Sequence, residues 1–181
     1  MITKEDFKEV CERSLKLIEE AGIQLTSEEK QKITSADFGL DQIKKEGVQI
    51  ITLFDTNRMA AKILVLLPYQ TEPEHWHPPV GDDPGKEEVI RGVWGDLTFY
   101  VPGEDTLEKG FLVEGKEAYY TMRNEVVIGP GDQLILPPGT KHWFQAGARG
   151  AVMYSFSTKV TDLLDQFTDP GVVRDTVIEG Y

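Results

Sequence analysis

The chain has 181 residues, of which 40% are hydrophobic and 28% charged, which fits one soluble globular domain with a full core. Its formal net charge is −12 at pH 7, and no cluster of Lys and Arg stands in the sequence, so we expect neither nucleic acid nor a membrane surface as a partner. The single cysteine, Cys11, excludes an internal disulfide framework.

Residues 1–45 are predicted to form a helical extension. Thr3 begins a pattern that resembles a capping box, and apolar residues at helical spacing follow as far as Gly22, which supplies a stop signal. A second, shorter helix is expected to end at Ile33. Cys11 lies on the apolar stripe of the first helix, which favours a buried thiol over a reactive one. Because these helices precede a strand-rich region, we expect them to pack on the outside of a sheet.

Residues 46–160 change to short segments rich in β-formers, punctuated by Gly, Pro and Asp. The candidate strands are VQIITLF, KILVLLP, EEVIRGVW, DLTFYV, EAYYTM, VVIG, QLILP, KHWFQA and AVMYSF. No helical stretch of useful length interrupts them. The pattern therefore predicts a mainly β fold, a compact antiparallel β-barrel or jelly roll with the helices packed outside.

Residues 161–181 form a tail whose apolar side chains could dock onto the barrel, while a flexible end and a dimer contact are the alternatives. No linker or repeat divides the sequence, so we expect one domain overall. The N-terminal residues lack the apolar core of a secretion signal, and no apolar run approaches the length of a membrane span. We therefore expect a cytoplasmic protein.

All three histidines lie in segments that have the spacing of metal ligands. His75 and His77 are two residues apart, so on a β-strand they point to the same face. Glu88 adds a carboxylate from the next strand, and His142 follows a turn rich in Pro and Gly that can bring it in from across a barrel. Three imidazoles and a carboxylate suit Mn²⁺, Fe²⁺, Co²⁺, Ni²⁺ or Zn²⁺. Histidines on surface loops are the alternative, but the joint fit favours a metal site.

These segments resemble the cupin superfamily. Its second motif, Gly-x5-Pro-x-Gly-x2-His, is met by Gly131, Pro137, Gly139 and His142. Its first motif, His-x-His followed by a Glu and then a Gly, is met by His75, His77, Glu88 and Gly95. Two departures stand out: Ala146 replaces the Asn that ends the second motif, and the spacer PPVGDDPGKE is longer than in the general family. A loop can absorb the longer spacer without moving the ligands.

The long spacer sharpens the resemblance. PEHWHPPVGDDPGKEE, GTKHWFQAG and the late FTDP look like the D-lyxose isomerase family of cupins, over residues 48–170. The resemblance implies a Mn²⁺-dependent isomerase of free monosaccharides that interconverts D-lyxose and D-xylulose, and also D-mannose and D-fructose. It implies His75, His77, Glu88 and His142 as the metal ligands, and strand alternation turns Glu87 outward. We expect a homodimer, since cupins commonly pair through their sheets.

Isomerisation through a cis-enediol needs a group that moves a proton between two carbons, and histidines that bind metal are not free for it. Lys86 is two residues before Glu88, so we expect it on the ligand face, with a pKa lowered by the nearby cation. A solvated surface lysine is the alternative. Asp169 is the second catalytic candidate if the tail folds over the barrel mouth, although an Asp before Pro also suits a plain turn. Alternation turns Glu74 away from the histidines.

Trp94 and Phe144 are candidates to line a sugar pocket, because the C–H faces of sugars pack on aromatic rings, with barrel core as the alternative. Ser155 is expected to point inward from the last strand. Two other functions fit the same pattern, a cupin dioxygenase that uses Fe²⁺ and a non-catalytic sugar-binding cupin. Phosphate esters are disfavoured as substrates, since the chain is acidic and has no Gly-rich phosphate loop.

Overall fold

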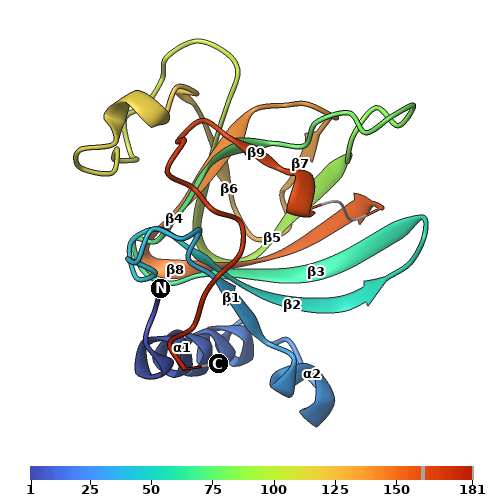
Figure 1. Cartoon of the computed structure of the whole chain (residues 1–181), viewed down its shortest axis with the longest axis vertical. Helices are drawn as coiled ribbons and strands as arrows, with labels where there is room; N and C mark the ends of the chain where they lie inside the picture. The colour runs from blue at the N-terminus through green and yellow to red at the C-terminus, as the bar shows by residue number, and fades with distance from the viewer. Residues whose placement is uncertain (160–161, 181) are drawn as a thin grey trace.

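An antiparallel sheet of nine strands curls into a barrel in the computed structural model, which describes residues 1–159 and 162–180 (Figure 1). The helices outside it are α1 (Lys4–Glu20) and α2 (Ser27–Gln31). The strands are β1 (Thr34–Ala36), β2 (Val48–Asp55), β3 (Met59–Leu66), β4 (Thr71–Trp76), β5 (Glu88–Val101), β6 (Asn124–Ile128), β7 (Gln133–Leu136), β8 (His142–Thr158) and β9 (Gln166–Phe167). Two short 3₁₀ helices, η1 (Glu117–Tyr119) and η2 (Asp162–Leu164), lie between strands. This architecture confirms the predicted fold class.

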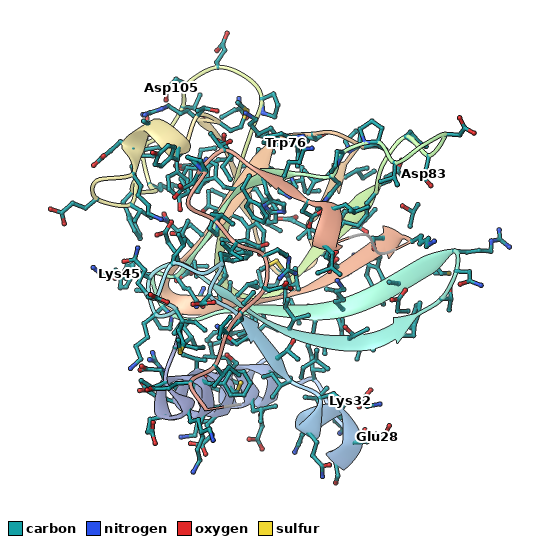
Figure 2. All side chains as sticks on the ribbon, in the orientation of Figure 1. Glu28, Lys32, Lys45, Trp76, Asp83 and Asp105 are labelled. Atoms are coloured by element: carbon teal, nitrogen blue, oxygen red, sulfur yellow. The ribbon has the colours of Figure 1, made fainter. Side chains whose placement is uncertain are left out.

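Helix α1 packs its apolar stripe against the outer face of the barrel. It begins at Thr3, whose side-chain oxygen accepts a hydrogen bond from the backbone N–H of Asp6 at 3.0 Å and donates one to its carboxylate. Ile18 is buried among Ile63 and Val152 of the sheet. The shorter helix α2 projects from the barrel, with exposed side chains that include the labelled Glu28 and Lys32 (Figure 2).

The long strands β5 and β8 hold the barrel together. The strand order is β1-β2-β3-β8-β4-β9, and β5 pairs with β8, β6 and β7. Inward-facing side chains of both long strands form the main core, where the rings of Phe99 and Phe144 stack with centroids 4.5 Å apart. Each long strand is continuous where the sequence predicted two separate strands. Glycines lie between the predicted segments, and the pairing of β5 with β8 shifts its register there instead of ending.

The segment Glu117–Met122, which we expected as a strand, forms η1 and an irregular loop instead. The buried carboxylate of Glu74 accepts hydrogen bonds from the backbone N–H groups of Thr121 and Met122, at 2.6 and 2.8 Å. A side chain therefore satisfies backbone donors that a neighbouring strand would otherwise have paired. Glu74 faces this loop, on the side of β4 away from the histidines, as alternation predicts.

The C-terminal tail docks on the barrel and then returns to α1, so that both ends of the chain lie near that helix (Figure 1). Strand β9 pairs with β4 through Phe167 and His75, and Ile178 bridges to Ile2. β1 also joins the sheet, although we expected residues 1–45 to be helical. The division into an extension, a barrel and a tail at these boundaries stays a prediction. Among the described residues, no helix has the length and apolar character that crossing a membrane requires.

Candidate metal centre

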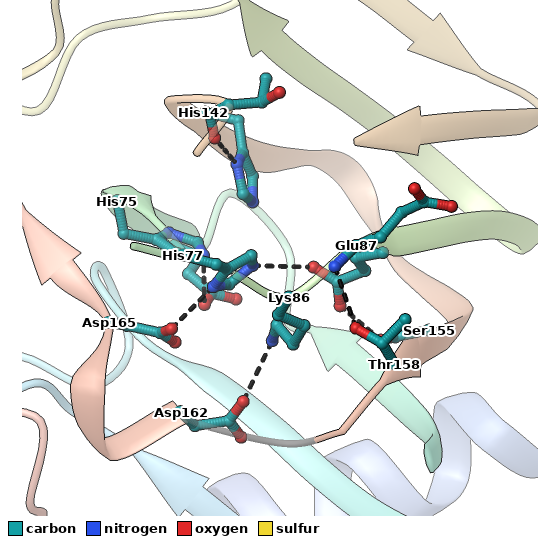
Figure 3. A network of polar contacts seen from close by, with 12 residues as sticks. His75, His77, Lys86, Glu87, His142, Ser155, Thr158, Asp162 and Asp165 are labelled. Carbon is teal, nitrogen blue, oxygen red and sulfur yellow. Dashed lines mark hydrogen bonds and ion pairs between the residues drawn. The ribbon is translucent and has the colours of Figure 1, made fainter. Parts of the chain in front are cut away.

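Neighbouring strands bring the three histidines together at one end of the barrel (Figure 3). His75 near the end of β4 is the register partner of His142 at the start of β8, and His77 follows β4 directly. One ring nitrogen of each histidine lies within 4.8 Å of the other two, and all three residues are buried. The strand pairing thus converts two distant sequence segments into one cluster of imidazoles.

Glu88 adds a buried carboxylate to the cluster. One of its oxygens, Oε2, lies 3.2 Å from Nε2 of His77, and the other accepts a hydrogen bond from the hydroxyl of Ser155. Ser155 therefore does point inward, and it holds the carboxylate from β8. The neighbouring Glu87 is exposed, and its backbone N–H donates to Thr158 (Figure 3).

Each histidine is oriented through its Nδ1 atom. Nδ1 lies 2.8 Å from the carbonyl oxygen of Pro73 in His75, and 2.9 Å from that of Thr140 in His142. A carbonyl oxygen can only accept, so these two Nδ1 atoms carry the proton and the Nε2 atoms hold the lone pairs. Nδ1 of His77 contacts a carboxylate, Oδ1 of Asp165, at 2.6 Å.

The charges of these groups fit a divalent cation. Burial lowers the pKa of His142 to about 4, with a further contribution from His77, and burial also lowers the pKa of His75 well below its usual value. Both rings are therefore neutral near pH 7, as metal ligands must be. Burial opposes ionisation of Glu88, but the charge of Lys86 and the contact with His77 outweigh it and hold its pKa low. Burial opposes the charged form of His77 too, but its contacts with Asp165 and Glu88 outweigh burial and raise its pKa, so this ring must give up a proton to bind a metal. Two neutral imidazoles, this third ring and an anionic carboxylate form a donor set that suits a divalent transition metal.

A small cavity of about 30 Å³ adjoins the cluster. Its polar lining comprises Lys62, Glu72, His75, His77, Lys86, Glu88, Asp162, Asp165 and Arg174, and Phe144 contributes an apolar wall. Oε1 of Glu72 lies 3.8 Å from Nε2 of His75, while its Oε2 is buried and no described residue donates to it. Burial is the chief cause that raises the pKa of Glu72 to about 8.

The chain matches no family model, but it is closely similar to curated proteins over nearly its whole length. It is 47% identical to the D-lyxose ketol-isomerase of Cohnella laeviribosi over 175 residues, 96% of each chain. It is 43% identical to the D-lyxose/D-mannose isomerase of Thermosediminibacter oceani over 180 residues, 99% of each. The chain belongs to the D-lyxose isomerase family. The predicted family is thereby confirmed, and with it a sugar isomerase as the class of enzyme.

Solved structures share the fold of this D-lyxose isomerase family member. The L-ribose isomerase of Acinetobacter sp. DL28 superposes with a TM-score of 0.79 at 14% identity, covering 98% of both chains. The L-ribose isomerase of Cellulomonas parahominis superposes with a TM-score of 0.76 at 15% identity, also covering 98% of both chains. At these identities the likeness shows the fold alone.

Lys86 lines the cavity as expected, although it lies in the segment just before β5 and not on a strand. Its Nζ lies 3.0 Å from Oδ1 of Asp162. Burial disfavours the ammonium, yet the charges of Glu88, Asp162 and Asp165 outweigh burial and raise the pKa of Lys86. The expected lowering depends on a bound cation and stays a prediction; two of the carboxylates that raise the pKa come from the tail and were not counted.

Asp169 does not line the cavity, although the tail docks as its catalytic role requires. Its Oδ2 lies 2.9 Å from Nζ of Lys116, which also pairs with Glu46 at 3.0 Å. Its other oxygen, Oδ1, accepts a hydrogen bond from the backbone N–H of Gly171 in the turn that follows. Asp169 thus anchors the tail. The tail instead brings the carboxylates of Asp162 and Asp165 to the cavity, and our sequence reasoning missed both residues.

The two aromatic candidates lie on opposite faces of the sheet. Phe144 faces inward, lines the cavity and stacks on Phe99. Trp94 packs outside with Val152, in the cluster beneath α1, so placing it at the sugar pocket was wrong. A β-bulge between Gly92 and Trp94 inserts one residue into β5, and this reverses the face to which Trp94 points.

Proposed function

We propose that this sugar isomerase is metal-dependent and acts on free monosaccharides, interconverting D-lyxose and D-xylulose and also D-mannose and D-fructose through a cis-enediol. The names of its relatives support the choice of sugars. The observation that carries the proposal is the convergence of three buried imidazoles beside the carboxylate of Glu88. Such a donor set is hard to explain by packing alone, since buried polar groups cost free energy unless they have partners.

The four groups that would hold the ion are His75, His77, Glu88 and His142. Mn²⁺ is our first choice, with Fe²⁺, Co²⁺, Ni²⁺ and Zn²⁺ as alternatives. When bound, a divalent cation supplies Lewis acidity for the carbonyl and hydroxyl oxygens of the sugar that react. The protein's own contribution is to keep these donors dry and fixed in direction, and to keep the imidazoles of His75 and His142 neutral.

Two further side chains are placed to act on the sugar itself. We assign Lys86 a catalytic role as an ammonium that donates a hydrogen bond to a reacting oxygen, since its Nζ lines the cavity and is held there by Asp162. Glu72 is our candidate for the group that takes the proton from carbon, because it lines the cavity with Oε1 3.8 Å from Nε2 of His75, and a bound cation nearby would favour the ionised form that this step needs. Phe144 would pack against the C–H face of the sugar.

A second cavity of about 260 Å³ gives the rest of the sugar room. It shares Ile50, Lys62, Asp162 and Arg174 with the small cavity at the histidines. Thr34, Thr52 and Thr176 add hydroxyl groups to its wall. We infer that the carbons remote from the reaction lie in this second cavity, whose hydroxyl, ammonium and guanidinium groups match sugar hydroxyls.

A test uses protein stripped with a chelator and then reloaded with Mn²⁺. D-Xylulose or D-fructose is added under nitrogen, and aldose formation is followed. Turnover without oxygen that depends on the added metal supports the proposal. Oxygen uptake with Fe²⁺ and no aldose would instead indicate a dioxygenase, and tight sugar binding without turnover would indicate a binding protein.

The homodimer and the cytoplasmic location are also proposals, and light scattering of the purified protein tests the dimer.

A further inference from the structure

The three histidines differ in what orients them. The groups that contact Nδ1 of His75 and His142 are backbone carbonyls two residues earlier in the same segment. The group that contacts Nδ1 of His77 is the carboxylate of Asp165, which is 88 residues away in sequence and lies on the C-terminal tail. One of the three ring directions thus depends on a tertiary contact, whereas the other two are set locally.

The tail segment that carries Asp165 is fixed on both sides of that residue. Before it, Asp162 pairs with Lys86 (Figure 3) and also with Lys62. After it, β9 pairs with β4, and the side chain of Thr168 donates to Glu74 at 2.6 Å. Asp165 itself has a side chain only 6% exposed, so its carboxylate is committed to the ring of His77 and is not a solvated surface group.

We propose that Asp165 is a positioning residue of the metal centre, and that docking of residues 162–169 and binding of the metal strengthen each other. The inference rests on the proposed metal dependence. The carboxylate on Nδ1 keeps a proton on that atom, so Nε2, which lies 3.2 Å from Oε2 of Glu88, is the atom that would lose its proton to bind a metal. Such partners are worth about 10- to 100-fold in metal affinity where they have been removed from other sites.

The coupling follows from reciprocity. If the docked tail raises the affinity for the metal, the metal must favour the docked tail by the same factor. The local carbonyls of Pro73 and Thr140 do not take part in this coupling, since each lies only two residues before the histidine that it orients. The structure therefore makes the tail a part of the metal centre, although no residue of the tail is itself proposed as a ligand.

The experiment compares wild type with Asp165→Asn and Asp165→Ala, and takes Glu179→Gln as the charge-matched control on an exposed part of the tail. Affinity for Mn²⁺ is measured by competition with a chromophoric chelator, and the rate of proteolytic cleavage within the tail is measured with and without Mn²⁺. Circular dichroism checks that each variant keeps the barrel.

We expect Mn²⁺ to slow cleavage of the tail in wild type and in Glu179→Gln. Both Asp165 variants should bind Mn²⁺ roughly 10- to 100-fold more weakly and lose most of the protection. At saturating Mn²⁺ their kcat should recover most of the wild-type value, because a positioning residue acts through the ligand. If the Asp165 variants bind Mn²⁺ as tightly as wild type, or if cleavage of wild type ignores the metal, the inference is wrong while the proposed function stands. If wild type and its variants show the expected affinities but convert no sugar, the proposed function fails alone.

Discussion

Nζ of Lys86 lies 3.0 Å from Oδ1 of Asp162, so the strand that carries Glu88 is tied to the C-terminal tail inside the cavity. The same aspartate also pairs with Lys62, and Arg174 lies 3.8 Å from it. Burial opposes the charge of Asp162, but the two lysines outweigh it and hold its pKa well below the usual range. Cations and carboxylates therefore alternate around the space that the sugar is proposed to enter.

Lys86→Met tests the role of this ammonium. We expect kcat to fall by about 10²-fold or more, because a hydrogen-bond donor to a reacting oxygen is lost, while Mn²⁺ affinity stays within a few-fold of wild type. Lys62 and Arg174 still neutralise Asp162, so the fold should persist. Steady-state kinetics and metal titration measure both effects, with Lys30→Met on α2 as the control. Normal turnover of Lys86→Met would rule out a catalytic role.

His77→Ala tests the metal centre itself. Removing one of three imidazoles should abolish metal retention through gel filtration and reduce isomerisation to background. Trp76→Phe is the control, since this neighbour is half-buried and has the ammonium of Lys141 4.9 Å from its ring. Elemental analysis of both variants and of wild type gives the bound metal. Retention of a full equivalent by His77→Ala would remove the basis of the site.

Phe144→Leu and Trp94→Leu separate the two aromatic residues. Both changes should destabilise the protein by roughly 1–3 kcal/mol, because each ring packs in a cluster. Phe144→Leu should also raise KM for D-xylulose roughly tenfold, the scale of one lost apolar contact in a pocket. Trp94→Leu should leave KM unchanged, since its ring lies beneath α1. Equal KM values for the two variants would argue against Phe144 as a sugar contact.

Glu72→Gln gives a pH dependence in protein freed of metal by a chelator. Burial raises the folded-state pKa of Glu72 to about 8 from a usual value of 4.5. Between these values the folded state holds a proton that the unfolded chain has released, so ionisation of this group lowers stability as pH rises. Glu72→Gln removes that loss. Relative to the variant, wild type should therefore become less stable from pH 5 to pH 8, as measured by urea unfolding. If the difference in free energy of unfolding between wild type and Glu72→Gln did not change with pH, the pKa of Glu72 would not be raised by folding.

The cluster of three histidines and the β-fold could be predicted from the sequence because both rest on local patterns. Alternation along a strand places His75 and His77 on one face, and the Pro- and Gly-rich turn before His142 marks where the chain re-enters the barrel. Alternate side chains point to opposite faces because of the backbone geometry of a strand, so this pattern holds in any sheet that the strand joins.

The contacts that fix the chemistry around these residues were decided by the tertiary structure. One inserted residue in β5 turned Trp94 to the outside, and no composition rule signals such a bulge. The tail brought Asp162 to Lys86 and Asp165 to His77, and these carboxylates help to raise the pKa of the lysine when no cation is bound. The ionisation of a buried group depends on every charge that folding places beside it, however distant in sequence, and a local pattern carries no record of those distances.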